Sequence, residues 1–314
     1  MSLDVRTAIA VTLATLISAC VSAGDQREVD TLTGSPNYTA TRYPIVLMPG
    51  ILGFNKLLGT VEYFPAIPQA LEDGGAKVYV VYGSQVNSST VRAQQIIPQL
   101  EAIVAATGSG KVNLIAHSQG AIDARIIAAE RPDLVASVTS IAGPNAGSPV
   151  ADRVLDGSLT PLAEPAFGAL GDLFTLMAGS TDSNDVHAAM VGMSTAGMAQ
   201  FNAMYPAALP TTPCGAGAAE VNGVKYYSWG GTGSLTNPLD LLDPVWVLGT
   251  PMAGDGNDGL IPRCSNHLGT VIRDDYWLNH IDETNMIFGL IGALGPKPVA
   301  LFRAHANRLR NEGL

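Results

Sequence analysis

The sequence predicts an α/β fold with a mostly parallel sheet flanked by helices, and two observations indicate it. In the first half of the chain, short apolar runs typical of covered strands alternate with segments whose apolar residues recur at helical spacing. The 314 residues are 47% hydrophobic and 14% charged, a composition that can fill one large core. Alternating strands and helices form parallel sheets, whose functional loops follow the carboxyl ends of the strands.

The elements of this half follow from local pattern. Four strands are expected, at residues 43–50, 77–83, 112–118 and 135–144. A helix is expected at 90–107, because apolar residues recur there every three or four positions. Another helix should begin directly after Ser118 and end before Pro132. The third strand therefore turns straight into a helix at Ser118.

The turn at Ser118 has the pattern of a nucleophile elbow, which lifts a serine Oγ above the sheet and directs backbone N–H groups at a developing oxyanion. Within AHSQG, Gly120 lets the strand and helix cross closely, whereas Ala116 stands where the usual G-x-S-x-G motif has glycine. The alternative is a serine that merely caps the helix. The pentapeptide alone leaves both interpretations open.

Residues 1–23 resemble a signal peptide, and residues 24–314 are expected to form a single mature domain. Arg6 precedes the apolar stretch TAIAVTLATLISA, which is too short for a stable membrane anchor. Small residues before Gly24 suit ordinary cleavage, while ISAC resembles a lipobox with cleavage before Cys20. We therefore expect a secreted, extracellular protein or, alternatively, an outer-membrane lipoprotein anchored through Cys20.

Charge limits the classes of binding partner, and the cysteine count limits the possible disulfides. The formal net charge of -10 and the pI near 4.8 disfavour binding to nucleic acid or to anionic membranes. The chain has three cysteines, and pairing of Cys214 with Cys264 in an exported protein would leave Cys20 as the odd one.

Residues 148–212 are expected to form an insertion of helices and loops without strands. Within it, residues 162–177 present a broad apolar face, formed by Leu162, Phe167, Leu170, Leu173, Phe174, Leu176 and Met177. Such a face fits a mobile lid that covers a cleft in water and turns toward lipid at an interface. An ordinary core helix is the alternative.

A serine nucleophile needs a histidine base and an orienting acid, and a hydrolase built on such an elbow has them in the chain order serine, acid, histidine. His117 adjoins the serine but should point to the opposite face, and His187 precedes any suitable acid. The remaining candidates are His267, His280 and His305 for the base and Asp255 and Asp258 for the acid. The residues alone do not choose among them.

From about Tyr43 to the C-terminus, the chain resembles the true lipases of bacterial family I, the Pseudomonas and Burkholderia type of triacylglycerol lipase in the α/β-hydrolase superfamily. The matching segments, in collinear order, are YPIVL, GILGF, KVNLIAHSQG, ERPDLVASVTSIAGP, NDGLIPRC, WLNHIDETN and HANRLR. The resemblance implies an α/β-hydrolase fold with a helical lid insertion.

Carried over position by position, the resemblance implies a catalytic triad, an oxyanion hole and a disulfide. The implied residues are Ser118 as nucleophile, Asp258 as acid, His280 as base, Ile51 and Gln119 as backbone N–H donors, and the pair Cys214 and Cys264. Besides Ala116, one departure stands out. The family has His-Gly before the oxyanion residue, whereas this chain has Pro49-Gly50, and proline fixes φ and removes an N–H.

The resemblance also implies one structural calcium ion near the His280 loop. The implied ligands are the carboxylates of Asp240 and Asp282 and the main-chain carbonyls of Met286 and Leu290. Asp243 is a rival to Asp240 in the same segment. Asp282 could instead simply open the helix that follows it, because a carboxylate is favourable at a helix N-terminus.

We therefore expect a secreted triacylglycerol lipase that hydrolyses carboxylic ester bonds at an oil–water interface through a Ser-Asp-His triad and an acyl-enzyme. A lipase-specific foldase chaperone is a further partner that the resemblance suggests. The alternatives are a polyester or short-chain ester hydrolase of the same fold, and an inactive exported α/β-hydrolase that acts as a binding protein.

Overall fold

The computed structural model describes residues 36–51, 53, 62–168, 185–240, 242–254, 256–292 and 294–314. The expected signal peptide, both cleavage sites and Cys20 lie outside the described residues. So do Asp255 and residues 169–177 of the expected lid helix.

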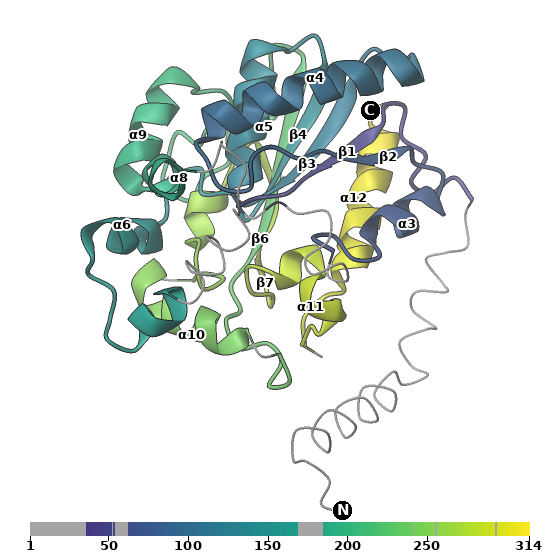
Figure 1. Cartoon of the computed structure of the whole chain (residues 1–314). Helices are drawn as coiled ribbons and strands as arrows, with labels where there is room; N and C mark the ends of the chain where they lie inside the picture. Colours follow the sequence, from purple (N-terminus) through teal and green to yellow (C-terminus); the bar gives the residue numbers. More distant parts are fainter. Residues whose placement is uncertain are drawn as a thin grey trace, which may run out of the picture.

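The described residues contain a seven-stranded, mostly parallel sheet flanked by helices (Figure 1). The strands are β1 Ile45–Met48, β2 Val78–Val80, β3 Val112–His117, β4 Val135–Ile141, β5 Glu220–Val221, β6 Val224–Gly231 and β7 Thr270–Tyr276. Their spatial order is β2-β1-β3-β4-β6-β5, and β7 pairs with β6. Short β5 runs antiparallel to β6, and the other pairings among these strands are parallel. All four expected strands are present, each one to four residues shorter than its apolar run.

Helices cover both faces of this sheet. They are α3 Ile67–Glu72, α4 Ser89–Thr107, α5 Gln119–Glu130, α6 Pro149–Asp156, α8 Val186–Met193, α9 Thr195–Met204, α10 Asp243–Ala253, α11 Met286–Gly289 and α12 Pro298–Asn311, with short 3-10 helices at Arg263–Asn266 and Asp282–Thr284. The helix expected at 90–107 is α4. Ser88 caps its start through the N–H of Val91, and Gly108, at φ 63, ends it.

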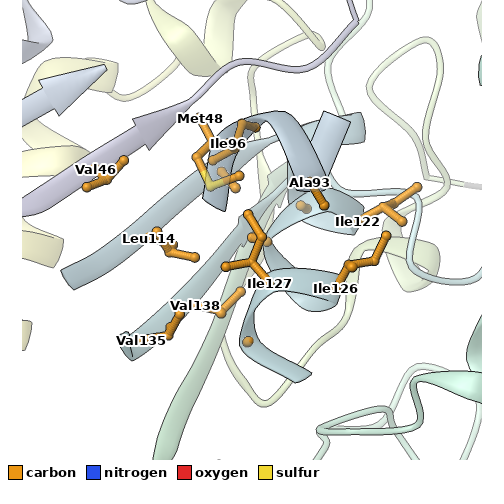
Figure 2. Packing of buried hydrophobic residues seen from close by; sticks show 14 of the residues in the cluster. Val46, Met48, Ala93, Ile96, Leu114, Ile122, Ile126, Ile127, Val135 and Val138 are labelled. Carbon is orange, nitrogen blue, oxygen red and sulfur yellow. The ribbon is translucent and has the colours of Figure 1, made fainter. Parts of the chain in front are cut away.

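Alternation along the strands divides the core between the two faces. In β1, Val46 and Met48 pack in the cluster that contains residues of α4 and α5, while Ile45 and Leu47 pack in the cluster that contains residues of α3 and α12. Figure 2 shows the first cluster, in which the strand side chains lie beside Ile96 of α4 and Ile127 of α5. Both faces of the sheet are therefore apolar, and the site residues gather at the ends of the strands.

Between residues 148 and 212, the described part of the chain holds α6, α8, α9 and a helical stretch at 163–168, and no strand. Phe167 packs partly buried against Met252 and Ala253 of α10. Across the residues that the structure describes, no helix combines the length and the apolar character that a membrane crossing requires.

Candidate active site

The nucleophile elbow is present at the junction of β3 and α5. Ser118 has φ 55 and ψ -129, a backbone conformation that is costly for a residue with a side chain. Its N–H donates to the carbonyl of Ile141 on β4, which fixes the turn from the neighbouring strand. The Ser118 side chain makes no cap bond to α5. The helix-capping interpretation is therefore wrong, and the hydroxyl is available for another partner.

That partner is His280. The Ser118 hydroxyl lies 2.9 Å from Nε2 of His280, and Nδ1 of the same ring lies 2.8 Å from a carboxylate oxygen of Asp258. All three side chains are buried. An Nδ1–H that donates to the carboxylate leaves Nε2 as the acceptor for the serine proton, which is the arrangement that a general base needs.

The backbone around Asp258 holds this carboxylate in place. Its Oδ1 accepts the N–H groups of Leu260 and Ile261 at 2.9 and 2.7 Å, and its carbonyl accepts the N–H of His280 at 3.0 Å. With the ring bond to His280, these hydrogen bonds join the Asp258 turn to itself and to the His280 loop. Such support keeps the acid and the base at a fixed separation.

The other candidate histidines have different partners. The ring of His267 bonds to the carbonyl of Gly215 and to Asp274. His305 is buried in the core, where it bonds to Thr139 and accepts a hydrogen bond from Arg308. The structure therefore brings His280, rather than His267 or His305, to the serine.

The oxyanion donors expected from the resemblance lie on either side of Ser118. Gln119 is the first residue of α5, and the first N–H groups of a helix have no acceptor within that helix. Ile51 follows Gly50, which approaches the nucleophile so closely that a Cβ on Gly50 would lie 2.6 Å from the Cβ of Ser118. Glycine is required there. The loop that carries Ile51 therefore lies directly beside Ser118.

Tyr63 and His117 connect the loop of Gly50 and Ile51 to the His280 loop, a connection that no pattern in the sequence indicated. The N–H of Gly50 donates to the Tyr63 hydroxyl at 2.9 Å, which lies 2.7 Å from Nδ1 of His117. Nε2 of His117 lies 2.9 Å from the carbonyl of His280. Because a carbonyl only accepts, Nε2 carries the proton and Nδ1 accepts the Tyr63 proton. These three hydrogen bonds link Gly50 to the backbone of His280 through two buried side chains.

A second group of carboxylates lies beneath the His280 loop. Oδ2 of Asp282 accepts hydrogen bonds from the Thr236 hydroxyl and the N–H of Asn279, while its Oδ1 is buried without a partner. Oδ2 of Asp240 is likewise buried without a partner. Burial raises the pKa of Asp282 to about 7, and nearby Asp243 and Asp240 add to the rise. Two orphaned carboxylate oxygens in one acidic region are suited to a hard cation.

Asp243 also lies close to Asp282, but its oxygens have partners. The carboxylate accepts the N–H groups of Thr236 and Asn237 and the amide of Asn279, each at 2.7 Å. Among the described residues, no group of three or more His, Cys, Asp or Glu side chains is placed to hold a metal ion. Any cation here would need backbone carbonyls besides the carboxylates.

Glu283 is a further buried acid that the sequence analysis did not single out. Its Oε1 accepts the N–H of Gly231 at the end of β6. Burial, together with the nearby charge of Asp258, raises the pKa of Glu283 well above its usual value. The motif WLNHIDETN therefore contributes the histidine that meets Ser118 and two buried acids within four residues.

The expected disulfide between Cys214 and Cys264 is present, with a Cα–Cα distance of 4.6 Å. It joins the loop before β5 to the 3-10 helix Arg263–Asn266, five residues after Asp258. The bond therefore ties the segment that follows the acid to a distant part of the chain.

Comparisons with known proteins agree with this architecture. A family model described as the alpha/beta hydrolase fold matches residues 43–164. A metagenomic carboxyl esterase has a TM-score of 0.60 at 20% identity, covering 87% of this chain and 76% of its own. A mature Bacillus licheniformis lipase has a TM-score of 0.60 at 17% identity, covering 86% and 93%. The protein is an α/β hydrolase.

Curated relatives define the family within that class. A triacylglycerol lipase of Vibrio cholerae is 44% identical over 95% of this chain and 96% of its own. Triacylglycerol lipases of Pseudomonas fragi and Burkholderia plantarii are 40% and 38% identical, over 87% and 88% of this chain and 98% and 88% of theirs. The chain belongs to the bacterial triacylglycerol lipase family and is a carboxylic ester hydrolase, which confirms the resemblance seen in the sequence.

Proposed function

We propose that this protein hydrolyses triacylglycerol through Ser118, His280 and Asp258. The observation that carries the proposal is the continuous hydrogen-bonded line from the Ser118 hydroxyl through both His280 ring nitrogens to Asp258. The strained backbone of Ser118 supports it, because such strain persists where a nucleophile must be presented.

The reaction follows from this geometry in two halves. His280 takes the proton of Ser118 as the serine oxygen attacks the ester carbonyl, and Asp258 stabilises the imidazolium that forms. The N–H groups of Ile51 and Gln119 stabilise the oxyanion. The alcohol leaves with the proton of His280, and water then attacks the acyl-enzyme through the same steps.

Ser118→Ala tests the assignment, with Ser89→Ala as the matched control. Ser89 is also a buried serine at the start of a helix, but it lies on α4. We expect Ser118→Ala to lower kcat by ~10³-fold or more with little change in melting temperature, and Ser89→Ala to keep wild-type turnover. Activity near wild type in Ser118→Ala would exclude the triad.

Calcium is proposed as a structural ion between the segment at 236–243 and the His280 loop. Asp282 would hold it with one carboxylate of Asp240 or Asp243 and with the carbonyls of Met286 and Leu290. The orphaned oxygens of Asp240 and Asp282 fit this role. When bound, the ion would neutralise clustered carboxylates and so hold the His280 loop in place.

Chelation and substitution test the ion together. We expect a chelator to lower the melting temperature and the turnover of the wild type, and Asp282→Asn to abolish the response to added calcium. Asp240→Asn and Asp243→Asn then assign the second ligand, because only the variant at the ligand loses the calcium response. A wild type that melts at the same temperature with and without the chelator would exclude the site.

Secretion, the lid at 162–177 and dependence on a foldase stay predictions. Mass spectrometry of protein from the culture medium distinguishes cleavage before Gly24 from lipid attachment at Cys20. Hydrolysis of a triglyceride series beside an aliphatic polyester and a soluble short-chain ester separates a lipase from the alternative hydrolases. Covalent labelling of Ser118 by an organophosphate separates an enzyme from an inactive binding protein.

A further inference from the structure

Four large apolar side chains are exposed on three loops near the catalytic histidine. They are Leu235 at 55% exposure, Leu239 at 68%, Trp277 at 44% and Leu294 at 87%. We call this set the loop patch. Single exposed apolar residues are common, but several on neighbouring loops indicate a surface that binds something.

Backbone contacts hold the three loops together. The N–H of Gly233 donates to the carbonyl of Leu278 at 3.0 Å, next to Trp277. Gly295, which follows Leu294, approaches the carbonyl of Trp277 so closely that a Cβ there would lie 2.4 Å from that oxygen. The side chain of Asn237, between the two leucines of the first loop, donates to the carbonyl of Ile291. The loop patch is therefore a surface with fixed support.

Charge is absent from these loops. Residues 233–239, 277–281 and 284–296 contain no Asp, Glu, Lys or Arg. Of the charged residues that flank them, Asp240, Asp282 and Glu283 are buried, whereas Asp275 is exposed and paired with Arg273, and Lys297 follows the third loop. Because the loops themselves carry no charge, no ion on them has to be desolvated when their apolar side chains enter a hydrocarbon layer.

The position of the loop patch relates it to the reaction. Trp277 directly follows β7 and precedes His280 by three residues. The loop with Leu235 and Leu239 follows β6, and Leu294 follows α11. In Figure 1, β7, α10 and α11 lie at the lower end of the molecule, away from α9. Because Trp277 is only three residues from His280, a surface that Trp277 contacts lies close to the loop that carries the proposed base.

We propose that the loop patch inserts into the surface of an uncharged or zwitterionic lipid layer and holds the catalytic centre against it, separately from the lid expected at 162–177. The proposal rests on the proposed function only for the choice of lipid as the occupant. Tryptophan suits the boundary, because its indole has an apolar body and an N–H that can meet headgroups. The net charge of -10 disfavours an anionic layer.

Binding to phosphatidylcholine vesicles tests the proposal in a Ser118→Ala background, so that hydrolysis does not alter the lipid. The test variant adds Trp277→Ser and Leu294→Ser. The control variant adds Met204→Ser, which removes a side chain of 68% exposure from α9. We expect the test variant to partition to vesicles at least roughly tenfold more weakly than its parent, because each apolar side chain buried in lipid adds to the free energy of binding. The control variant should bind like its parent.

Tryptophan fluorescence gives a second readout. The other two tryptophans, Trp229 and Trp246, are buried, so Trp277 is the exposed reporter. We expect its emission to shift to shorter wavelength when vesicles are added to the Ser118→Ala protein. The same substitutions in active enzyme should lower hydrolysis of emulsified triglyceride and leave a soluble short-chain ester unchanged.

The outcomes separate this proposal from the proposed function. If the Ser118→Ala protein binds vesicles through the loop patch but the protein with Ser118 intact hydrolyses no ester, the patch is upheld and the lipase assignment is rejected. Unchanged binding of the test variant, or an equal loss in the control, would overturn the patch. It would also be overturned if the parent protein is a dimer in solution that the test variant disperses, since the patch would then cover a second copy.

Discussion

Removing one hydroxyl should disturb both the stability and the activity of this enzyme, because the Tyr63 hydroxyl joins the loop of the proposed oxyanion donor Ile51 to the loop of the proposed base His280. It accepts the N–H of Gly50 and donates to His117, and it is buried. Burial raises the pKa of Tyr63 far above its usual value, so the hydroxyl keeps its proton for His117 at all working pH values. Tyr63→Phe keeps the ring and removes both hydrogen bonds.

The expected loss of stability in Tyr63→Phe follows from the two polar groups that lose their partner. The Gly50 N–H and His117 Nδ1 would each remain buried without a partner, and an unsatisfied buried group costs about 1–3 kcal/mol. Together they should lower the free energy of unfolding by about 2–6 kcal/mol, or roughly 4–12 °C in melting temperature for a chain of this size. The loop that carries Ile51 would also lose an anchor, and we expect kcat to fall roughly tenfold, less than the loss of an oxyanion donor itself.

Tyr227→Phe is the matched control. Tyr227 is also a buried tyrosine, and its hydroxyl donates to Glu312. Without that hydroxyl, Glu312 would still have Lys225 and solvent as partners. We expect a loss of about 1 kcal/mol there and an unchanged kcat. Thermal unfolding and turnover of a soluble ester measure both effects. A Tyr63→Phe enzyme with wild-type kcat, or one that differs from wild type no more than the control does, would refute the link between Tyr63 and the oxyanion loop.

Three further predictions concern other parts of the chain. Replacing Cys214 and Cys264 with serine together should lower stability by about 4 kcal/mol, because the disulfide closes a loop with a sequence separation of 50, and denaturant unfolding with and without reductant checks this. Burial lowers the pKa of His305 well below 6.5, so as the pH falls the unfolded chain binds a proton that the folded chain does not. The free energy of unfolding should therefore decrease as the pH falls below 6.5, by up to about 1.4 kcal/mol per pH unit. His305→Gln should flatten that slope in urea titrations between pH 7 and 5, and an equally steep slope would contradict it. If residues 162–177 are a lid, Phe167→Ser combined with Phe174→Ser should lower hydrolysis of emulsified long-chain triglyceride far more than hydrolysis of a soluble ester, whereas equal losses would indicate a core helix.

Local pattern predicted the elements that depend on neighbouring residues. The strand that ends at His117, the turn at Ser118 and the helix that follows were all expected, because apolar periodicity and a glycine two positions later are properties of one segment. The alternation of Ile45, Val46, Leu47 and Met48 between two clusters likewise follows from the side-chain period of a strand. These features need no knowledge of distant segments.

The partners of Ser118 could not be chosen in this way. His280 is separated from Ser118 by 162 positions. His267 and His305 are also histidines near expected turns or helices, so local sequence does not distinguish the three. Resemblance to a family selected His280, and the fold then places it at the hydroxyl. The Tyr63–His117 link spans 54 positions and has no spacing rule, so no pattern in the chain indicated it.

The two departures from the family motif, Ala116 and Pro49, are explained by which residue has the strained backbone and which groups hold the loop. Ala116 is inside β3, paired with Met48 and Ser140, and the positive φ of the elbow falls on Ser118 instead. An extended residue accepts a methyl group, so glycine is not required at 116. Pro49 lacks an N–H, but the oxyanion loop is held by its carbonyl, which accepts a hydrogen bond from buried Arg92, and by the N–H of the next residue, Gly50. Proline therefore costs this loop no hydrogen bond, and its fixed φ restricts the chain just before the donor at Ile51.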